Sequence, residues 1–237
     1  MGGESKLLIA NWKMNLSLRC SIDLLRRIEY KNPYKKLVIC PPSLHIYPLI
    51  KLFSHFNFGA QDCSENSSGS HTGEVSAMML KEIGCEYVII GHSERRAKYS
   101  ESNEIIKKKS IQAVRAGLSP IICIGEYLND SKENKLKHLL DQLKELDLDN
   151  VYAVAYEPVW AIGSGLTPSI SDIKYLLNGI KIFYPQLKLL YGGSVTVENS
   201  KQLFDLKDIN GLLVGGASLD ADKLNEILGV HSIANPL

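Results

Sequence analysis

The chain has 237 residues, of which 45% are hydrophobic and 22% are charged, and its formal net charge is +1. This composition is typical of a globular protein, and the length suits one large domain. A net charge this close to zero argues against nucleic acid or an anionic membrane surface as a partner, so any anion that the protein binds must be held by local groups.

Short apolar runs typical of buried strands alternate along the chain with amphipathic stretches of helical period. The predicted strands are Leu7–Ala10, Leu37–Cys40, Phe58–Ala60, Tyr87–Ile90, Pro120–Ile124, Val151–Ala155, Lys188–Tyr191 and Gly211–Val214. The helical stretches include Ile22–Tyr30, Ile105–Ala116, Lys132–Leu146, Ile170–Phe183 and Ala221–Leu228. Strands that are apolar on both faces imply a parallel sheet covered by helices. Eight units in this length predict an α/β fold, a single-domain (β/α)8 barrel over residues 1–237, with residues 1–5 as a disordered lead-in.

Residues with distinctive chemistry follow several of these strands. In a barrel the carboxyl ends of all strands converge on one face, where enzymes of this architecture keep their active sites. The residues at that face are Asn11-Trp12-Lys13, Gly91-His92-Ser93-Glu94, Glu157, Gly192-Gly193-Ser194 and Gly215-Gly216. An ammonium, an imidazole, a carboxylate and glycine-rich turns are therefore expected to form one cluster.

Glu157 ends the sixth strand, and Pro158 is expected to stop the strand directly after it. The apolar residues 159–162 and the glycines of Gly163-Ser164-Gly165 follow, a composition that favours a loop able to move and to cover a site. A carboxylate under a water-excluding loop is a candidate general base. On its own, the segment would fit an ordinary strand-end glutamate beside a loop better than a catalytic base.

The two glycine pairs after the last two strands predict a phosphate site, because glycine lets backbone N–H groups approach an anion. A single Gly-Gly pair would be plain turn chemistry. Gly163-Ser164-Gly165 lacks the third glycine and the helix of a dinucleotide fingerprint, and the chain has no G-x-x-x-x-G-K-[ST] motif. The expected ligand is a small phosphate ester.

His92 opens a helix-starting segment, where positive charge is disfavoured, so a neutral imidazole that polarises a carbonyl is expected. Lys13 is a compact positive charge suited to an anionic substrate, and Asn11 alternates onto the same side of its strand. Cys123 lies within an apolar strand and is predicted to pack there. These residues together predict proton abstraction next to a carbonyl in a phosphorylated substrate.

Cysteine usage and the N-terminus bear on location. The five cysteines form no C-x-x-C pair, which argues against a disulfide framework and a zinc site. No His, Cys and carboxylate spacing predicts a metal, and no cofactor is expected. No apolar run approaches the ~20 residues of a membrane span, and a signal-peptide pattern is missing. We therefore expect a cytoplasmic protein.

Several segments, in order and from the first strand to the last helix, resemble the triosephosphate isomerase family. They are Asn11-Trp12-Lys13-Met14-Asn15, Gly91-His92-Ser93-Glu94-Arg95-Arg96, Cys123-Ile124-Gly125-Glu126, Ala155-Tyr156-Glu157-Pro158-Val159-Trp160-Ala161-Ile162-Gly163, Tyr191-Gly192-Gly193-Ser194-Val195 and Leu213-Val214-Gly215-Gly216-Ala217-Ser218-Leu219. The resemblance implies a TIM barrel and the interconversion of dihydroxyacetone phosphate and D-glyceraldehyde 3-phosphate through an enediolate, a step of glycolysis and gluconeogenesis.

The resemblance also implies residue roles. Glu157 would carry the proton between two carbons, neutral His92 would polarise the carbonyl, and Lys13, with Asn11 beside it, would stabilise negative charge. The backbones of Gly163, Ser194, Gly215 and Gly216 would hold the phosphate. Glu94, Tyr191, Cys123 and Glu126 match supporting positions, and Glu94 is expected to contact Lys13.

A homodimer is implied as well, in which a loop of one subunit completes the site of the other. Gln61, Thr72, Gly73, Glu74 and Arg95 resemble the family's dimer elements.

The chain departs from the family's pattern at the end of the loop after Glu157. The family usually has Lys-Thr-Ala there, and this chain has Leu166-Thr167-Pro168. The usual alanine bonds the tyrosine that matches Tyr191 through its backbone N–H, which proline lacks.

Two other functions remain open on the sequence alone. One is a different phosphosugar isomerase or epimerase on a phosphate-binding barrel, which would have no reason to combine Lys13, His92 and Glu157. The other is a non-catalytic scaffold that binds phosphate esters, which would need no base under an apolar loop.

Overall fold

The computed structural model describes residues 5–29, 35–126, 131–162 and 167–229. Its strands are β1 (Lys6–Asn11), β2 (Lys35–Cys40), β3 (Asn57–Ala60), β4 (Tyr87–Ile90), β5 (Ser119–Glu126), β6 (Ala153–Pro158), β7 (Leu189–Tyr191) and β8 (Gly211–Val214). Its helices are α1 (Leu18–Arg27), α2 (Ser43–Leu52), α3 (Ala77–Glu82), α4 (Ser93–Tyr99), α5 (Asn103–Arg115), α6 (Lys132–Lys144), α7 (Ile170–Phe183), α8 (Val197–Phe204) and α9 (Ala221–Leu228). Two 3₁₀ turns, η1 (Val159–Ala161) and η2 (Gly216–Leu219), follow β6 and β8.

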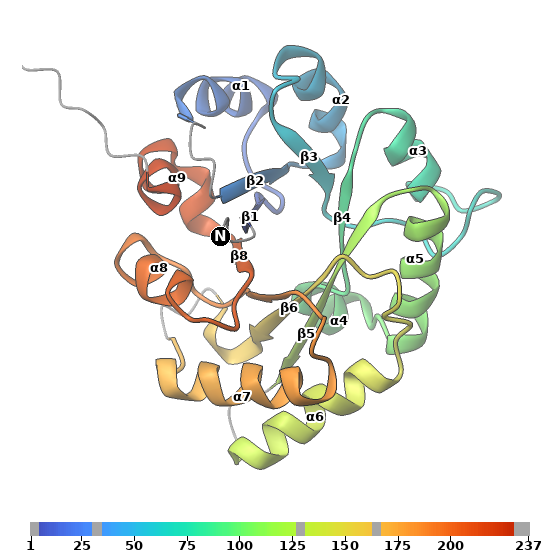
Figure 1. Cartoon of the computed structure of the whole chain (residues 1–237). Coiled ribbons are helices and arrows are strands. Elements are labelled where there is room, and N and C mark those ends of the chain that lie inside the picture. Colours follow the sequence, from blue (N-terminus) through green and yellow to red (C-terminus); the bar gives the residue numbers. More distant parts are fainter. Residues whose placement is uncertain (1–4, 30–34, 127–130, 163–166, 230–237) are drawn as a thin grey trace, which may run out of the picture.

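The strands close into a barrel in chain order, and every neighbouring pair is parallel, including β8 with β1. Figure 1 shows the helices arranged as a ring around the strands. This closed barrel confirms the predicted fold class. The prediction that residues 1–237 act as one domain with a lead-in stays a prediction, and residues 1–4 lie outside the described part of the chain.

Alternation along the strands divides the apolar side chains into two layers. Ile9 and Val38 belong to a buried cluster inside the barrel, whereas their neighbours Leu8 and Leu37 belong to the larger layer between strands and helices. Strands buried on both sides read as continuous apolar runs, which is why the strand positions could be predicted.

The observed boundaries match the predicted strands closely, with one correction at the sixth. Pro158 does not stop the strand before it, because β6 extends to Pro158, which pairs with Glu126 of β5. Proline lacks the N–H that would continue the hydrogen-bond ladder of the sheet. It is tolerated at the last position of a strand because the ladder ends there. The start also differs, since β6 begins at Ala153 rather than at Val151.

Most helices begin after a residue whose side chain accepts a hydrogen bond from a backbone N–H of the first turn, which satisfies one of the otherwise unpaired donors. These N-caps are Ser17, Ser76, His92, Ser102, Ser131, Ser169, Thr196 and Asp220. Predicted Ile170–Phe183 and Ala221–Leu228 are helices with those limits, whereas predicted Ile22–Tyr30 both begins earlier, at Leu18, and ends earlier, at Arg27.

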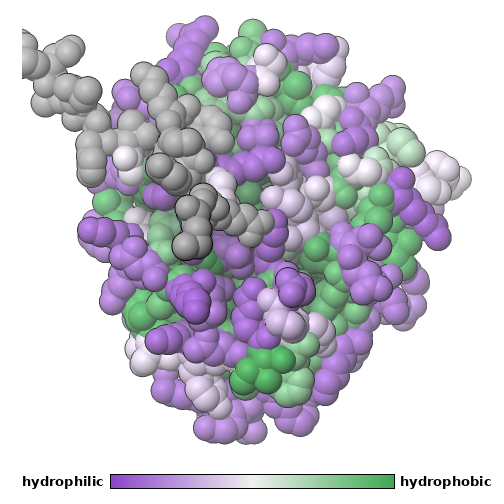
Figure 2. All heavy atoms as spheres, in the orientation of Figure 1, coloured by the Kyte–Doolittle hydropathy of each residue, from purple (hydrophilic) through white to green (hydrophobic). Residues whose placement is uncertain are grey.

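The outer surface mixes polar and apolar residues. In the coloured part of the face that Figure 2 shows, hydrophilic side chains are spread widely, with hydrophobic residues in separate patches between them. Within the described ranges, no helix has the length and apolar character needed to cross a bilayer.

Candidate active site

A cavity of about 240 Å³ opens at the carboxyl ends of the strands. Its lining includes the predicted residues Asn11, Lys13, His92, Ser194, Gly215 and Gly216, together with Gly192 and Gly193. These residues come from the end of β1 and from the segments after β1, β4, β7 and β8, which are far apart in the sequence. The barrel therefore brings the predicted cation, imidazole and glycine turns to one small cavity, smaller than the 300–1,000 Å³ or so typical of drug-sized ligands.

Glu157, on β6, is not part of this lining but lies against His92, which is, and the Glu157 side chain is only 1% exposed. Ser93 donates its backbone N–H to Glu157 Oε2 over 2.8 Å. The other oxygen, Oε1, is buried, and although His92 Nε2 lies 3.2 Å away, it accepts no hydrogen bond of good geometry from the described residues. Because a buried polar atom without a partner is unfavourable, it points to a functional role, and this oxygen can accept a proton.

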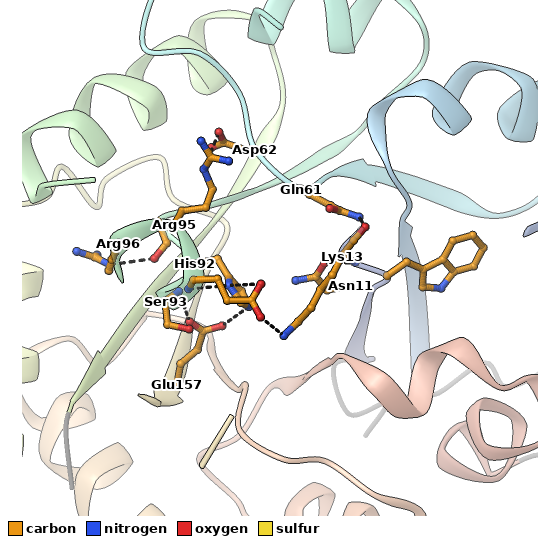
Figure 3. A network of polar contacts seen from close by, with 12 residues as sticks. Asn11, Lys13, Gln61, Asp62, His92, Ser93, Arg95, Arg96 and Glu157 are labelled. Carbon is orange, nitrogen blue, oxygen red and sulfur yellow. Dashed lines mark hydrogen bonds and ion pairs between the residues drawn. The ribbon is translucent and has the colours of Figure 1, made fainter. Parts of the chain in front are cut away.

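His92 is the N-cap of α4, and its ring is held in one orientation by the start of that helix. Its Nδ1 accepts a hydrogen bond from the backbone N–H of Glu94 over 3.2 Å, so Nδ1 carries no proton. The proton of the neutral ring is then on Nε2, which lies 3.2 Å from Glu157 Oε1. Figure 3 shows Glu157, His92 and Lys13 pointing toward one another from different strand ends.

Lys13 has a left-handed backbone, with φ at +53°, which is unusual for a residue with a side chain. Three hydrogen bonds hold it there. Its N–H donates to Asn11 Oδ1 over 3.0 Å, its carbonyl accepts from Gln61 Nε2 over 2.7 Å, and its Nζ donates to Glu94 Oε1 over 2.6 Å. The neighbours thus support a strained conformation that aims the ammonium into the cavity.

Glu94 is the partner that the resemblance implied for Lys13. Burial raises the pKa of the Glu94 carboxyl, but the hydrogen bond and charge of Lys13 outweigh that effect, and the pKa is lowered. Glu94 is therefore an anion that holds the lysine in its charged form close to the cavity.

The glycine turns after β7 and β8 line the same cavity as His92 and Lys13. Gly215 is followed by η2, which starts at Gly216, and a side chain at Gly216 would meet open space. Gly193 must remain glycine, since a Cβ there would lie 2.3 Å from the Tyr191 hydroxyl oxygen. Ser194 donates its hydroxyl to Ala161 O over 2.5 Å, which joins this turn to the segment after β6. Gly163, the remaining predicted phosphate ligand, lies outside the described residues.

Comparison with known proteins identifies the family. The sequence model of the triosephosphate isomerase family matches residues 6–231. The chain belongs to the triosephosphate isomerase family. It is 43% identical to the triosephosphate isomerase of Wolbachia sp. subsp. Brugia malayi over 94% of this chain and 97% of the relative. The crystal structure of the enzyme from Bartonella henselae superimposes with a TM-score of 0.85 at 35% identity, covering 95% of this chain and 98% of that one.

A further relative, the triosephosphate isomerase of Hahella chejuensis, is 41% identical over 95% of this chain and 98% of its own length. The predicted family is therefore confirmed, and the chain is an isomerase of the glycolytic triose phosphates.

Of the positions that match supporting residues of triosephosphate isomerases, two lie behind the site on β5. Glu126 accepts hydrogen bonds from Tyr156 Oη over 2.8 Å and from Trp160 Nε1 over 3.4 Å, and burial raises its pKa. Cys123 is fully buried, and burial raises the pKa of its thiol, so it packs rather than reacts. The third position, Tyr191, is fully buried, and no described residue bonds its hydroxyl.

The residues that match dimer elements divide into two groups. Thr72, Gly73 and Glu74 are exposed on the single chain. Arg95 and Gln61 instead make contacts within it. Arg95 pairs with Glu101 over 2.6 Å and with Asp62 over 2.9 Å, and Gln61 also donates to Cys40 O over 2.9 Å.

Sequence reasoning did not assign a role to the Ser93 N–H or to Gln61 as the support of Lys13. Ser93 lay within a quoted motif, but a backbone donor leaves no signal in the sequence. In the part of the chain that the structure describes, no three His, Cys, Asp or Glu residues gather into a metal-binding group.

Proposed function

We propose that this chain interconverts dihydroxyacetone phosphate and D-glyceraldehyde 3-phosphate with Glu157 as the base, His92 as the carbonyl-polarising group and Lys13 as the cation. The observation that carries the assignment is Glu157 Oε1, a buried carboxylate oxygen without a hydrogen bond that faces His92 Nε2 at 3.2 Å. Family membership supports the reaction, and the geometry supports the roles.

The reaction moves a proton between adjacent carbons of the substrate. Glu157 takes the proton from one carbon, which leaves an enediolate, and returns it to the neighbouring carbon. His92 donates the Nε2 proton to the carbonyl oxygen as negative charge develops there, and Lys13 stabilises the same charge from its own side of the cavity. In the structure Glu157 Oε2 accepts a hydrogen bond from Ser93 N, which leaves Oε1 as the oxygen that takes the proton.

The phosphate would occupy the glycine end of the cavity. Backbone N–H groups of Ser194, Gly215 and Gly216 are suited to bind its oxygens, and the family pattern adds Gly163. Glycine at these positions lets the backbone approach the anion, and Lys13 supplies positive charge nearby. The reaction needs no cofactor in this scheme.

A second copy of the chain would cover the exposed residues next to the site. Met14, directly after Lys13, is 95% exposed, and Leu44 at the start of α2 is 89% exposed. Apolar side chains this exposed, one of them directly after a catalytic residue, favour a homodimer in which Thr72, Gly73 and Glu74 reach the partner. Cytoplasmic location, and the lack of nucleic-acid or membrane partners, stay predictions.

The test is a coupled assay with glyceraldehyde 3-phosphate on the wild type and on Glu157→Asp. Shortening the side chain by one methylene withdraws the base by about an ångström, which lowers kcat on the order of 10²-fold and changes KM far less. Glu101→Asp is the matched control, because Glu101 is also a buried carboxylate, paired with Lys109 and Arg95 outside the cavity. It is expected to lower stability while keeping kcat within a few-fold of the wild type. A wild type without turnover, or equal losses of kcat in the two variants, would refute the assignment.

A further inference from the structure

The carboxylate of Glu157 borders a second cavity, of about 290 Å³, that lies behind the site. Side chains around it include Ser93, Arg96, Asn103, Gln142 and Val159. This cavity has no part in the proposed reaction, but it gives the backbone around the base room to shift. Other contacts must therefore fix the position of the backbone around Glu157.

The backbone that could shift in this way is the end of β5, which pairs directly with Glu157. β4 pairs with β5 only as far as Ile90 opposite Ile122, whereas β6 continues along β5 to Pro158 opposite Glu126. Past Ile122, β5 therefore has a strand neighbour on one side only. Its backbone groups beyond that point need partners from elsewhere.

Gly125 is the β5 residue opposite Glu157. The two backbones lie so close that a Cβ at Gly125 would stand 2.3 Å from Glu157 O and 3.0 Å from Val159 Cγ2. Gly125 has no side chain of its own to fix it, and glycine has the largest backbone freedom. A shift of Gly125 would be transmitted to Glu157 through this contact.

Gln142, on α6, holds Gly125 by both of its backbone groups. Its Nε2 donates to Gly125 O over 2.7 Å, and its Oε1 accepts from Gly125 N over 3.2 Å. The side chain is buried, so these hydrogen bonds are protected from water. Arg96 acts in the same way two residues earlier, donating to Cys123 O over 3.0 Å. Together they replace the strand neighbour that β4 no longer provides.

We propose that Gln142 is a positioning residue for the reaction, which fixes Glu157 by clamping Gly125 against the open cavity. This inference rests on the proposed role of Glu157 as the base. Gln142 touches neither the substrate cavity nor the reacting atoms, so its loss should lower kcat and leave KM nearly unchanged. A change of stability alone would mean that the clamp is only structural.

The test is Gln142→Met, which keeps the length and most of the volume and removes both hydrogen bonds. We expect kcat to fall about 10- to 100-fold, with KM within about threefold, because misplacement of a base by a fraction of an ångström slows proton transfer. The matched control is Asn225→Leu. Asn225 is another buried amide that clamps backbone on both sides, accepting from Glu29 N over 2.9 Å and donating to Arg27 O over 3.0 Å, far from the site. It should lose similar stability and keep kcat.

A double-mutant cycle separates positioning from general damage. If Gln142 acts through Glu157, then Gln142→Met should lower kcat less than about threefold in the Glu157→Asp background, where the base is already misplaced. The proposal is overturned if Gln142→Met retains wild-type kcat, if Asn225→Leu loses as much kcat, or if the two losses multiply in full. A wild type that turns over glyceraldehyde 3-phosphate while Gln142→Met is unimpaired would reject the clamp and leave the proposed function standing.

Discussion

Replacing Tyr191 by phenylalanine removes one hydroxyl and leaves the ring in place. Tyr191 is fully buried, its hydroxyl has no hydrogen-bond partner among the described residues, and it crowds Gly193. A buried hydroxyl without a partner is unfavourable by about 1–3 kcal/mol. Tyr191→Phe should therefore raise the free energy of unfolding by up to about 1–2 kcal/mol, or Tm by about 2–4 °C per kcal/mol for a chain of this size.

Urea unfolding and steady-state kinetics test this prediction together. The departure from the family's pattern at Pro168 offers a reason for the unpaired hydroxyl, because proline lacks the backbone N–H that the family's usual alanine offers to this tyrosine. In a Pro168→Ala background the N–H returns, so the same Tyr191→Phe change should then lose about 0.5–1.5 kcal/mol. If Tyr191→Phe destabilises the protein that keeps Pro168 by more than about 1 kcal/mol, or lowers its kcat tenfold, then the Tyr191 hydroxyl has a partner and this prediction is wrong.

Three further predictions concern the surroundings of the site. Burial raises the pKa of Asp62 to about 6, against a usual 3.8. At a pH between these two values, the native state holds a proton on Asp62 that the unfolded state has lost. The contribution of this group to the free energy of unfolding therefore decreases as pH rises from about 4 to 7. Measured by urea unfolding, the stability of Asp62→Asn relative to the wild type should increase over that range, and a difference that does not change with pH would contradict the shift. Gln61→Met leaves the Lys13 carbonyl unbonded and should lower kcat/KM about tenfold, with about 1–3 kcal/mol of stability lost, whereas unchanged kcat/KM would mean that Lys13 keeps its conformation unaided. Deleting residues 67–71 should give monomers of low activity by analytical ultracentrifugation and assay, and fully active monomers would show that the site needs no partner.

The barrel could be predicted because its strands are buried on both faces. Tyr87–Ile90 and Gly211–Val214 have the predicted limits in the structure, since each is a continuous apolar run bounded by polar or turn residues. The end of the sixth strand could not be predicted. Whether Pro158 pairs depends on the length of the neighbouring strand, β5, and this is a tertiary property.

The candidate site divides in the same way. Lys13 and His92 could be placed because they directly follow predicted strands, and the barrel fixes where strand ends meet. The role of Gln142 could not be predicted, because this residue lies in an ordinary amphipathic helix. Its role depends on hydrogen bonds to the backbone of Gly125, which is 17 residues away in the chain. Gln61 matched a dimer element by sequence, yet its amide also bonds the carbonyl of Lys13 within the same chain.

Two features of the site are unfavourable locally, and both lie where catalysis needs them. Lys13 keeps a left-handed backbone, and Glu157 keeps a buried carboxylate oxygen without a hydrogen bond. A flexible loop would relax either one, Lys13 by changing φ and Glu157 by finding a donor. Neither can relax here, because Lys13 is bonded through Asn11, Gln61 and Glu94, and Glu157 belongs to a strand with neighbours on both sides. The rigid barrel thus holds a base with one unpaired oxygen close to a strained cation, and an anionic substrate bound beside Lys13 adds a second negative partner to the one that Glu94 already provides.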